Sequence, residues 1–212
     1  METPASHAAA TRVPSLTDLC TDLTQKTADG ALEPVVRRDL ELEAMIEVLS
    51  KKERRNPMLL GEHGAGKTAI VEALAQRIVE GKVPVVLADM RVLAVSSEVL
   101  SAWAPNRERF KDLAKVLGTV ANSVNLILFV DGLRGTAGAP GKAPGQGLAG
   151  VLEFAMHETE VRCIGAGSEK QYEAACAAYP GLDKVFRILH VRPLDAAGAK
   201  LRTSAEPGEI TE

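Results

Sequence analysis

A glycine-rich segment carries the most specific chemistry in this sequence. It reads Gly61-Glu62-His63-Gly64-Ala65-Gly66-Lys67-Thr68 and fits the pattern G-x-x-x-x-G-K-[ST]. Such glycines let the backbone fold around a phosphate, so that N–H groups and the positive end of the following helix face the anion. The Lys67 ammonium would reach the β- and γ-phosphates, and the Thr68 hydroxyl would bind Mg²⁺. We predict a phosphate site rather than a chance match, and its expected binding residues are Glu62, His63, Gly64, Ala65, Gly66, Lys67, Thr68 and Ala69.

An apolar strand that ends in an acid supplies a second candidate group. The run from Leu126 to Val130 is followed directly by Asp131. A carboxylate at such a position orients Mg²⁺ in nucleotide-binding proteins, although an aspartate at a strand end is also a common turn or capping residue. Because this strand accompanies a phosphate loop, we favour the metal interpretation. Thr68 and Asp131 are therefore the predicted Mg²⁺ ligands.

The elements that must position these groups alternate along the chain. Apolar runs predict buried strands at Pro57–Gly61, Arg91–Val95, Asn125–Val130, Val161–Ala166 and Phe186–Val191. Apolar residues at helical spacing predict helices at Ser15–Ala28, Asp39–Leu49, Ile70–Ile78, Phe110–Leu117 and Leu148–Met156. Buried strands separated by amphipathic helices pair in parallel and are covered on both faces. The predicted fold class is α/β, a three-layer α/β/α sandwich with a parallel sheet.

Composition narrows the classes of function. The 212 residues are 46% apolar, enough for one core, and 25 Lys and Arg against 28 Asp and Glu leave a net charge of −3. That balance and the few aromatic residues argue against nucleic-acid and membrane partners. Cys20, Cys163 and Cys176 lack C-x-x-C spacing, which argues against a disulfide framework or a zinc site. Since no apolar run approaches the ~20 residues of a membrane span and the N-terminus lacks a signal pattern, we predict a cytoplasmic location.

Several segments closely resemble the first AAA+ module of Clp-type unfoldases and disaggregases. They are Asp22–Val36, Asn56–Glu62 and Gly66–Ile78, and Cys163–Ala166 resembles the strand that carries the sensor 1 residue of that family. The resemblance spans roughly Leu16 to Leu201 and implies a P-loop NTPase fold of the AAA+ type. By this resemblance, residues 15–195 are the large nucleotide-binding subdomain. Residues 1–14 are expected to be a flexible arm, and residues 196–212 the start of a truncated helical lid followed by a flexible tail.

The resemblance also implies a ligand, ATP or ADP with Mg²⁺. In the family, the segment that corresponds to Val35 and Val36 lies against adenine, so these two residues are candidate base contacts. Lys67, Thr68 and Asp131 match their family counterparts. Ser168 falls on the sensor 1 threonine and keeps a hydroxyl that could orient water or the γ-phosphate. His63 lies where the family often has proline, and we expect it to face solvent.

The departures from the family concern hydrolysis. The family's Walker B strand ends in Asp-Glu, whereas Asp131 is followed here by Gly132. The family's paired arginines, which reach a neighbouring subunit's γ-phosphate, align with Lys184 and Val185. Loss of a general base costs about 10²–10⁴ in rate, and loss of an arginine finger about 10³–10⁵. The aromatic pore residue of the family and its neighbouring glycine align with Asn106 and Glu108, so we expect no apolar grip on polypeptide.

Three functions therefore remain open from the sequence. The first is a nucleotide-binding module with weak or absent hydrolysis that acts in binding or regulation, with a protein partner or a Clp-type oligomer. The second is a working ATPase that uses another acid, for which Glu62, Glu153 and Glu158 are candidates. The third is an interaction module that no longer binds nucleotide.

Overall fold

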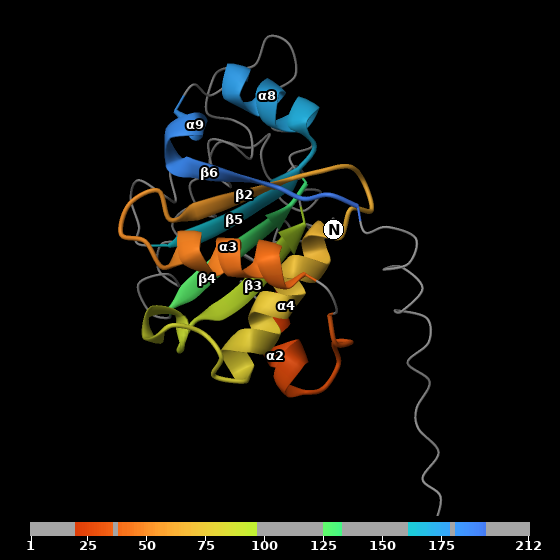
Figure 1. The fold of residues 1–212 in the computed structure, drawn as a ribbon, viewed down its shortest axis with the longest axis vertical. Helices are drawn as coiled ribbons and strands as arrows, with labels where there is room; N and C mark the ends of the chain where they lie inside the picture. The colour runs from red at the N-terminus through yellow and green to blue at the C-terminus, as the bar shows by residue number, and fades with distance from the viewer. Residues whose placement is uncertain (1–19, 36–37, 97–124, 133–160, 179–180, 194–212) are drawn as a thin grey trace, which may run out of the picture.

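The described part of the chain is built on one mostly parallel sheet. A computed structural model describes residues 20–35, 38–96, 125–132, 161–178 and 181–193. Within these residues the strands follow the order β1-β3-β4-β5-β2-β6 (Figure 1). Their bounds are Cys20–Asp22 for β1, Asn56–Leu60 for β2, Arg91–Ser96 for β3, Leu126–Asp131 for β4, Arg162–Gly167 for β5 and Phe186–His190 for β6. Every neighbouring pair is parallel except β1 and β3.

Helices cover this sheet. The described helices are α2 (Leu23–Ala28), α3 (Asp39–Leu49), α4 (Lys67–Val79), the 3₁₀ helix η1 (Val85–Leu87), α8 (Glu169–Ala178) and α9 (Leu182–Val185). Helices α2, α3 and α4 lie on one face of the sheet (Figure 1). All of β2 is buried, and so is β4 up to its last residue, so both faces of the central strands are covered. The predicted α/β fold with a central sheet is confirmed.

The predicted helix Ser15–Ala28 is wrong at residues 20–22 and confirmed from Leu23 to Ala28, while its residues 15–19 lie outside the described part of the chain. Cys20–Asp22 form strand β1, in which Cys20 pairs with Val95 of β3 in antiparallel register. The helix begins only at Leu23, because the Asp22 carboxylate caps it by accepting a 2.9 Å hydrogen bond from the Gln25 N–H. Asp22 also pairs with Arg91 at the start of β3. Apolar spacing could not reveal this strand, since its partner is distant in the sequence, and the predicted parallel sheet therefore has one antiparallel edge.

Helix α8 is an element that the sequence analysis did not predict. Its N-terminus carries a reciprocal cap: the Ser168 Oγ accepts from the Gln171 N–H at 3.3 Å, and the Ser168 N–H donates to the Gln171 Oε1 at 2.9 Å. Ser-x-x-Gln is the sequence signature of such a capping box. That signature, present at Ser168–Gln171, could have located the helix.

Other predictions fall on residues that the structure does not describe. They are the arm 1–14, the lid start and tail 196–212, the helices Phe110–Leu117 and Leu148–Met156, and the individual residues Val36, Asn106, Glu108, Glu153 and Glu158. Among the described residues, none of the helices combines the length and apolar character needed to cross a membrane.

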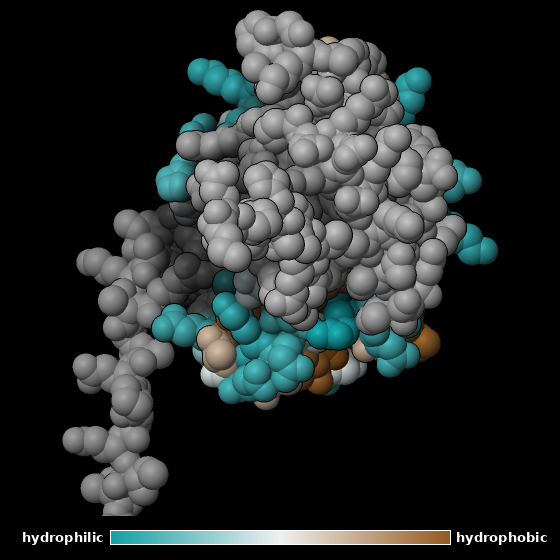
Figure 2. Space-filling view, turned by 180° about the vertical axis from the view of Figure 1, so that it is seen from behind, coloured by the Kyte–Doolittle hydropathy of each residue, from teal (hydrophilic) through white to brown (hydrophobic). Residues whose placement is uncertain are grey.

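The described surface mixes polar and apolar side chains. Seen from behind, hydrophilic and hydrophobic residues lie side by side along its lower edge (Figure 2). The large hydrophobic side chains that are exposed among the described residues are Leu40, Val79, Val85, Val86 and Ile188. Many of the other described apolar side chains form a core that includes residues of α2, α3, α4 and the central strands.

Cys163 is expected to be inert in the folded protein. Its side chain is fully buried in β5, and burial raises the pKa of the thiol to about 12 from 9.0. An unfolded chain releases this proton above about pH 9 whereas the fold retains it, so this group lowers the stability of the fold as the pH rises from 9 towards 12. In a Cys20→Ser/Cys176→Ser variant, alkylation of native protein at pH 8 should be roughly 10³-fold or more slower than in urea. Mass spectrometry would measure this, and equal rates would contradict the burial of Cys163.

Candidate functional site

The carboxyl ends of four strands meet at one edge of the sheet. The register places Leu60 of β2 beside Gly167 of β5 and His190 of β6. On the other side, Asp131 of β4 pairs with Ala166 of β5. The chain segments that leave these strands therefore start close together. They comprise the glycine-rich loop after β2, Gly132 after β4, Ser168 after β5 and Val191 after β6.

The glycine-rich loop has the conformation of an anion-binding turn. Gly64 and Gly66 have φ values of 77° and 90°, which L side chains rarely adopt, and the Ala65 N–H donates to the Glu62 carbonyl at 3.1 Å. Helix α4 begins directly at Lys67. The first N–H groups of a helix have no intrahelical acceptor and lie at the positive end of its dipole. The loop thus presents amide donors and positive potential at the sheet edge.

The predicted loop residues divide into two groups. Glu62, His63 and Gly64 are exposed, as expected for His63. Ala65 and Ala69 are buried in the core, so they can offer a ligand only their backbone. Their burial anchors the loop and the first turn of α4 against the sheet.

Lys67 is held at the mouth of the loop. Its Nζ donates to the carbonyl oxygens of Gly61 and Glu62, at 2.8 Å each. Partial burial lowers the pKa of Lys67, while the negative charges of Asp131 and Glu62 act in the opposite direction. A phosphate would compete with these two carbonyls for the ammonium, and it would form stronger, charge-assisted hydrogen bonds.

The two predicted Mg²⁺ ligands are in contact. The Thr68 Oγ1 donates to the Asp131 Oδ2 at 2.9 Å. A hydroxyl and a carboxylate are the hard oxygen donors that Mg²⁺ prefers, and this ion usually takes its other ligands from water and phosphate. Accordingly, the described residues contain no group of three or more His, Cys, Asp or Glu that could hold a metal by themselves. The donor set fits Mg²⁺ bound together with a phosphate.

The position after Asp131 carries no acid. Gly132 donates its N–H to the Ala166 carbonyl at 3.0 Å and has a φ of 86°. Lys184 and Val185 lie in α9, directly before β6. Since β6 runs parallel to β2, these two residues lie at the sheet edge opposite the phosphate loop. Within one chain they cannot reach a phosphate held by Lys67.

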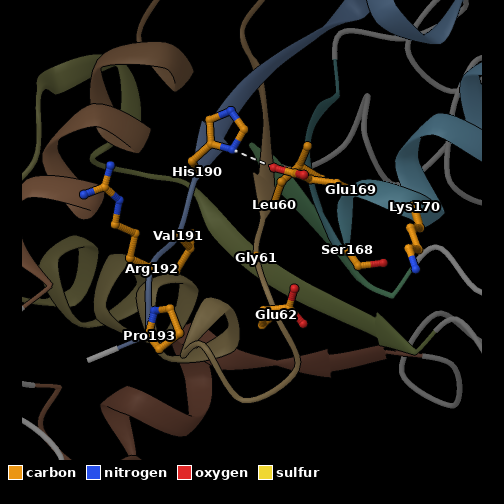
Figure 3. Close-up of a pocket in the computed structure, with 10 residues that line it drawn as sticks. All are labelled: Leu60, Gly61, Glu62, Ser168, Glu169, Lys170, His190, Val191, Arg192 and Pro193. Carbon is orange, nitrogen blue, oxygen red and sulfur yellow. Dashed lines mark ion pairs between the residues drawn. The ribbon is translucent and has the colours of Figure 1, made fainter. Parts of the chain in front are cut away.

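A cavity of about 560 Å³ lies beside the loop. It is lined by the start of the loop, the beginning of α8 and the end of β6 (Figure 3). Glu62 and Ser168 both line it, and in its wall the His190 Nδ1 lies 3.4 Å from the Glu169 Oε1 (Figure 3). Ser168 therefore lies near the loop, and its Oγ accepts the hydrogen bond from the Gln171 N–H that caps α8.

Two further residues join neighbouring segments to the loop, and the sequence analysis did not single them out. Arg38 is 4% exposed, and its Nη2 donates to the Ala65 carbonyl. Gln76, in α4, bonds to the backbone at Glu33 and Val35. Val35 is half-buried and packs against the core. Gln76 lies in the segment Gly66–Ile78 that resembles the Clp family, but neither that resemblance nor any chemical motif indicated a contact of Gln76 or Arg38 with distant backbone.

Comparison with known proteins points to the family that the sequence resembles. No protein-family model matches the chain. The chain is 38% identical over 179 residues to the ATP-dependent Clp protease ATP-binding subunit ClpC of Staphylococcus epidermidis and equally to that of Staphylococcus aureus strain USA300. The match covers 84% of this chain and 22% of each relative, so the chain spans about a fifth of their length.

Solved structures agree in fold. The closed state of Hsp104 with ATPγS and FITC casein superposes with a TM-score of 0.74 at 28% identity, covering 88% of this chain and 32% of the Hsp104 chain. The Saccharomyces cerevisiae Hsp104–ADP complex gives a TM-score of 0.74 at 30% identity, covering 88% and 26% of the respective chains. With the phosphate loop at the carboxyl ends of the parallel strands, the region matched is a domain of the Clp/ClpB-type AAA+ family.

Proposed function

We propose that this domain binds ATP or ADP with Mg²⁺ in the loop from Gly61 to Thr68 and hydrolyses ATP very slowly or not at all. The observation that carries the proposal is the contact between Thr68 and Asp131 beside the Lys67 ammonium, with Gly132 at the next position. Groups that would bind a magnesium-bound triphosphate are thus together, while the residue that follows Asp131 offers no carboxylate. The role we infer is binding or regulation rather than motor work.

Binding is supported by the chemistry of each group. The loop amides and Lys67 would hold the phosphates, and Thr68 and Asp131 would hold Mg²⁺, which neutralises phosphate charge. Val35 and Val36 would lie beside the base, and the Ser168 hydroxyl would face the γ-phosphate. The curated relatives are named ATP-binding subunits, and the similar Hsp104 structures are complexes with ADP or ATPγS.

Slow hydrolysis is expected because Gly132 and Lys184 stand where the family has a glutamate and an arginine. In-line attack on the γ-phosphate needs a group that orients or deprotonates the water, and Gly132 offers neither. Lys184 would keep a charge towards a neighbouring subunit but not the planar fork of arginine. Either loss is expected to lower the rate by about 10²-fold or more.

A working ATPase is the second candidate function. The observation in its favour is that Glu62 lines the same cavity as Ser168, so a carboxylate and a sensor-like hydroxyl share one space.

Three further proposals concern the whole protein, because the chain spans 22% of the length of its curated relatives. They are a regulatory or chaperone-related protein partner, a Clp-type oligomer and a cytoplasmic location.

Two measurements on the purified protein test the proposal. Mg-ATP at 100 times its dissociation constant should raise the free energy of unfolding by about 2.7 kcal/mol, seen as a higher melting temperature than with Mg²⁺ alone. Phosphate release should stay at background. No change in melting with Mg-ATP or Mg-ADP would favour the nucleotide-free interaction module. Steady phosphate release that disappears in Lys67→Ala would instead establish an active ATPase.

A further inference from the structure

We propose that Gln76 and Arg38 are positioning residues that join the segment Glu33–Val35 to the phosphate loop, so that a nucleotide base and its phosphates meet one preformed surface. This inference rests on the proposed nucleotide binding. Gln76 bonds the chain just before residues 36–37, and Arg38 follows them directly. Neither the Gln76 nor the Arg38 side chain is expected to touch the phosphates.

Gln76 holds the segment on one side. Its Nε2 donates to the Glu33 carbonyl at 2.7 Å, and its Oε1 accepts from the Val35 N–H at 3.4 Å. A side-chain amide that bonds both a carbonyl and an N–H substitutes for the backbone of a neighbouring strand. Because Gln76 belongs to α4, the helix that begins at Lys67, the segment is attached to the same helix that carries Lys67 and Thr68.

Arg38 holds the chain on the other side. Its Nη2 donates to the Ala65 carbonyl, and its Nη1 donates to the Arg192 carbonyl and the Glu41 Oε1, at 2.9 Å each. A buried guanidinium is tolerated only when it is paired and hydrogen-bonded, and Glu41 supplies the opposite charge. The conformation of the loop at Ala65 therefore depends on a residue close in sequence to Val35.

A third contact also joins the chain that follows Val35 to helix α4. Arg77, the next residue of α4, pairs with Asp39 at 3.0 Å, with side chains 31% and 71% exposed. Exposed ion pairs contribute little, so Gln76 and Arg38 dominate. Since Val35 is half-buried against the core, the wall offered to a base has a fixed place relative to the loop. Such preorganisation raises affinity, because less ordering is needed on binding.

The test compares two magnesium-bound probes, ATP and inorganic tripolyphosphate, which share the triphosphate chain but differ in the nucleoside. Gln76→Leu removes both hydrogen bonds while keeping the volume. We expect a loss of about 5- to 10-fold in ATP affinity, from one hydrogen bond of ordinary length and one long one, with tripolyphosphate affinity unchanged. Gln25→Leu is the matched control, because the Gln25 side chain donates to the Asp29 Oδ1 at the end of α2, away from the segment Glu33–Val35, and it should leave both affinities unchanged.

Arg38→Lys tests the second contact and keeps the positive charge. Lysine lacks the fork that bonds several carbonyls at once, so both ATP and tripolyphosphate should bind about 10-fold more weakly. Melting curves confirm that each variant is folded. If the wild type binds ATP but Gln76→Leu leaves its affinity unchanged, or weakens both probes equally, the inference is overturned while nucleotide binding stands. If the wild type binds neither probe, both the proposed function and the inference fail.

Discussion

Replacing Lys67 with alanine should weaken Mg-ATP binding by about 100-fold or more. The ammonium now bonds the carbonyls of Gly61 and Glu62 at 2.8 Å, and a triphosphate would replace them as its partner. Hydrogen bonds to charged groups contribute about 1.5–3 kcal/mol each, and two such bonds to the phosphates would account for the loss. Isothermal titration calorimetry of both proteins with Mg-ATP measures it directly.

Lys82→Ala is the matched control for this experiment. Lys82 is 65% exposed and pairs with Glu80 beyond the end of α4, so its loss should leave ATP affinity unchanged. A Lys67→Ala protein that binds Mg-ATP as tightly as the wild type would show that the loop is not the phosphate site. Equal losses in both variants would indicate a nonspecific charge effect.

Gly66→Ala should destabilise the protein by about 3 kcal/mol or more. Gly66 has a φ of 90°, and a Cβ there would lie 2.8 Å from the Arg38 Nη2. A left-handed conformation costs an L residue about 1–2 kcal/mol. Displacing a buried, paired guanidinium adds the cost of breaking its contacts with Ala65, Arg192 and Glu41. Urea unfolding monitored by circular dichroism gives the change in the free energy of unfolding.

Gly64→Ala separates the two causes. Gly64 has a φ of 77°, but a Cβ there would meet no atom within 4 Å. This variant should therefore lose only about 1–2 kcal/mol, the conformational cost alone. If Gly64→Ala and Gly66→Ala prove equally unstable, Arg38 does not brace the loop. In an Arg38→Ala background the additional loss from Gly66→Ala should shrink, because its steric partner is gone.

Most of the fold could be predicted because it depends on short-range patterns. The buried strands β2, β4 and β5 are continuous apolar runs, and α3 and α4 show apolar residues at helical spacing, so the α/β fold is confirmed. The predicted helix is wrong at residues 20–22, because Asp22 caps a helix that begins at Leu23 and Cys20–Asp22 pair with Leu93–Val95 of β3. Helix α8 was missed although Ser168 and Gln171 form a recognisable capping box.

The candidate site shows the same division. The loop from Gly61 to Thr68 and the acid Asp131 are recognisable from the amino-acid sequence, because glycine spacing and a strand-end carboxylate are local features. The long-range contacts emerge from the folded chain alone: Thr68 touches Asp131, 63 residues away, and Arg38 and Gln76 bond backbone groups 27 and 43 residues away. Such contacts depend on which strand ends are neighbours in the sheet and on which side chains the core buries, and neither is written in any single stretch of chain.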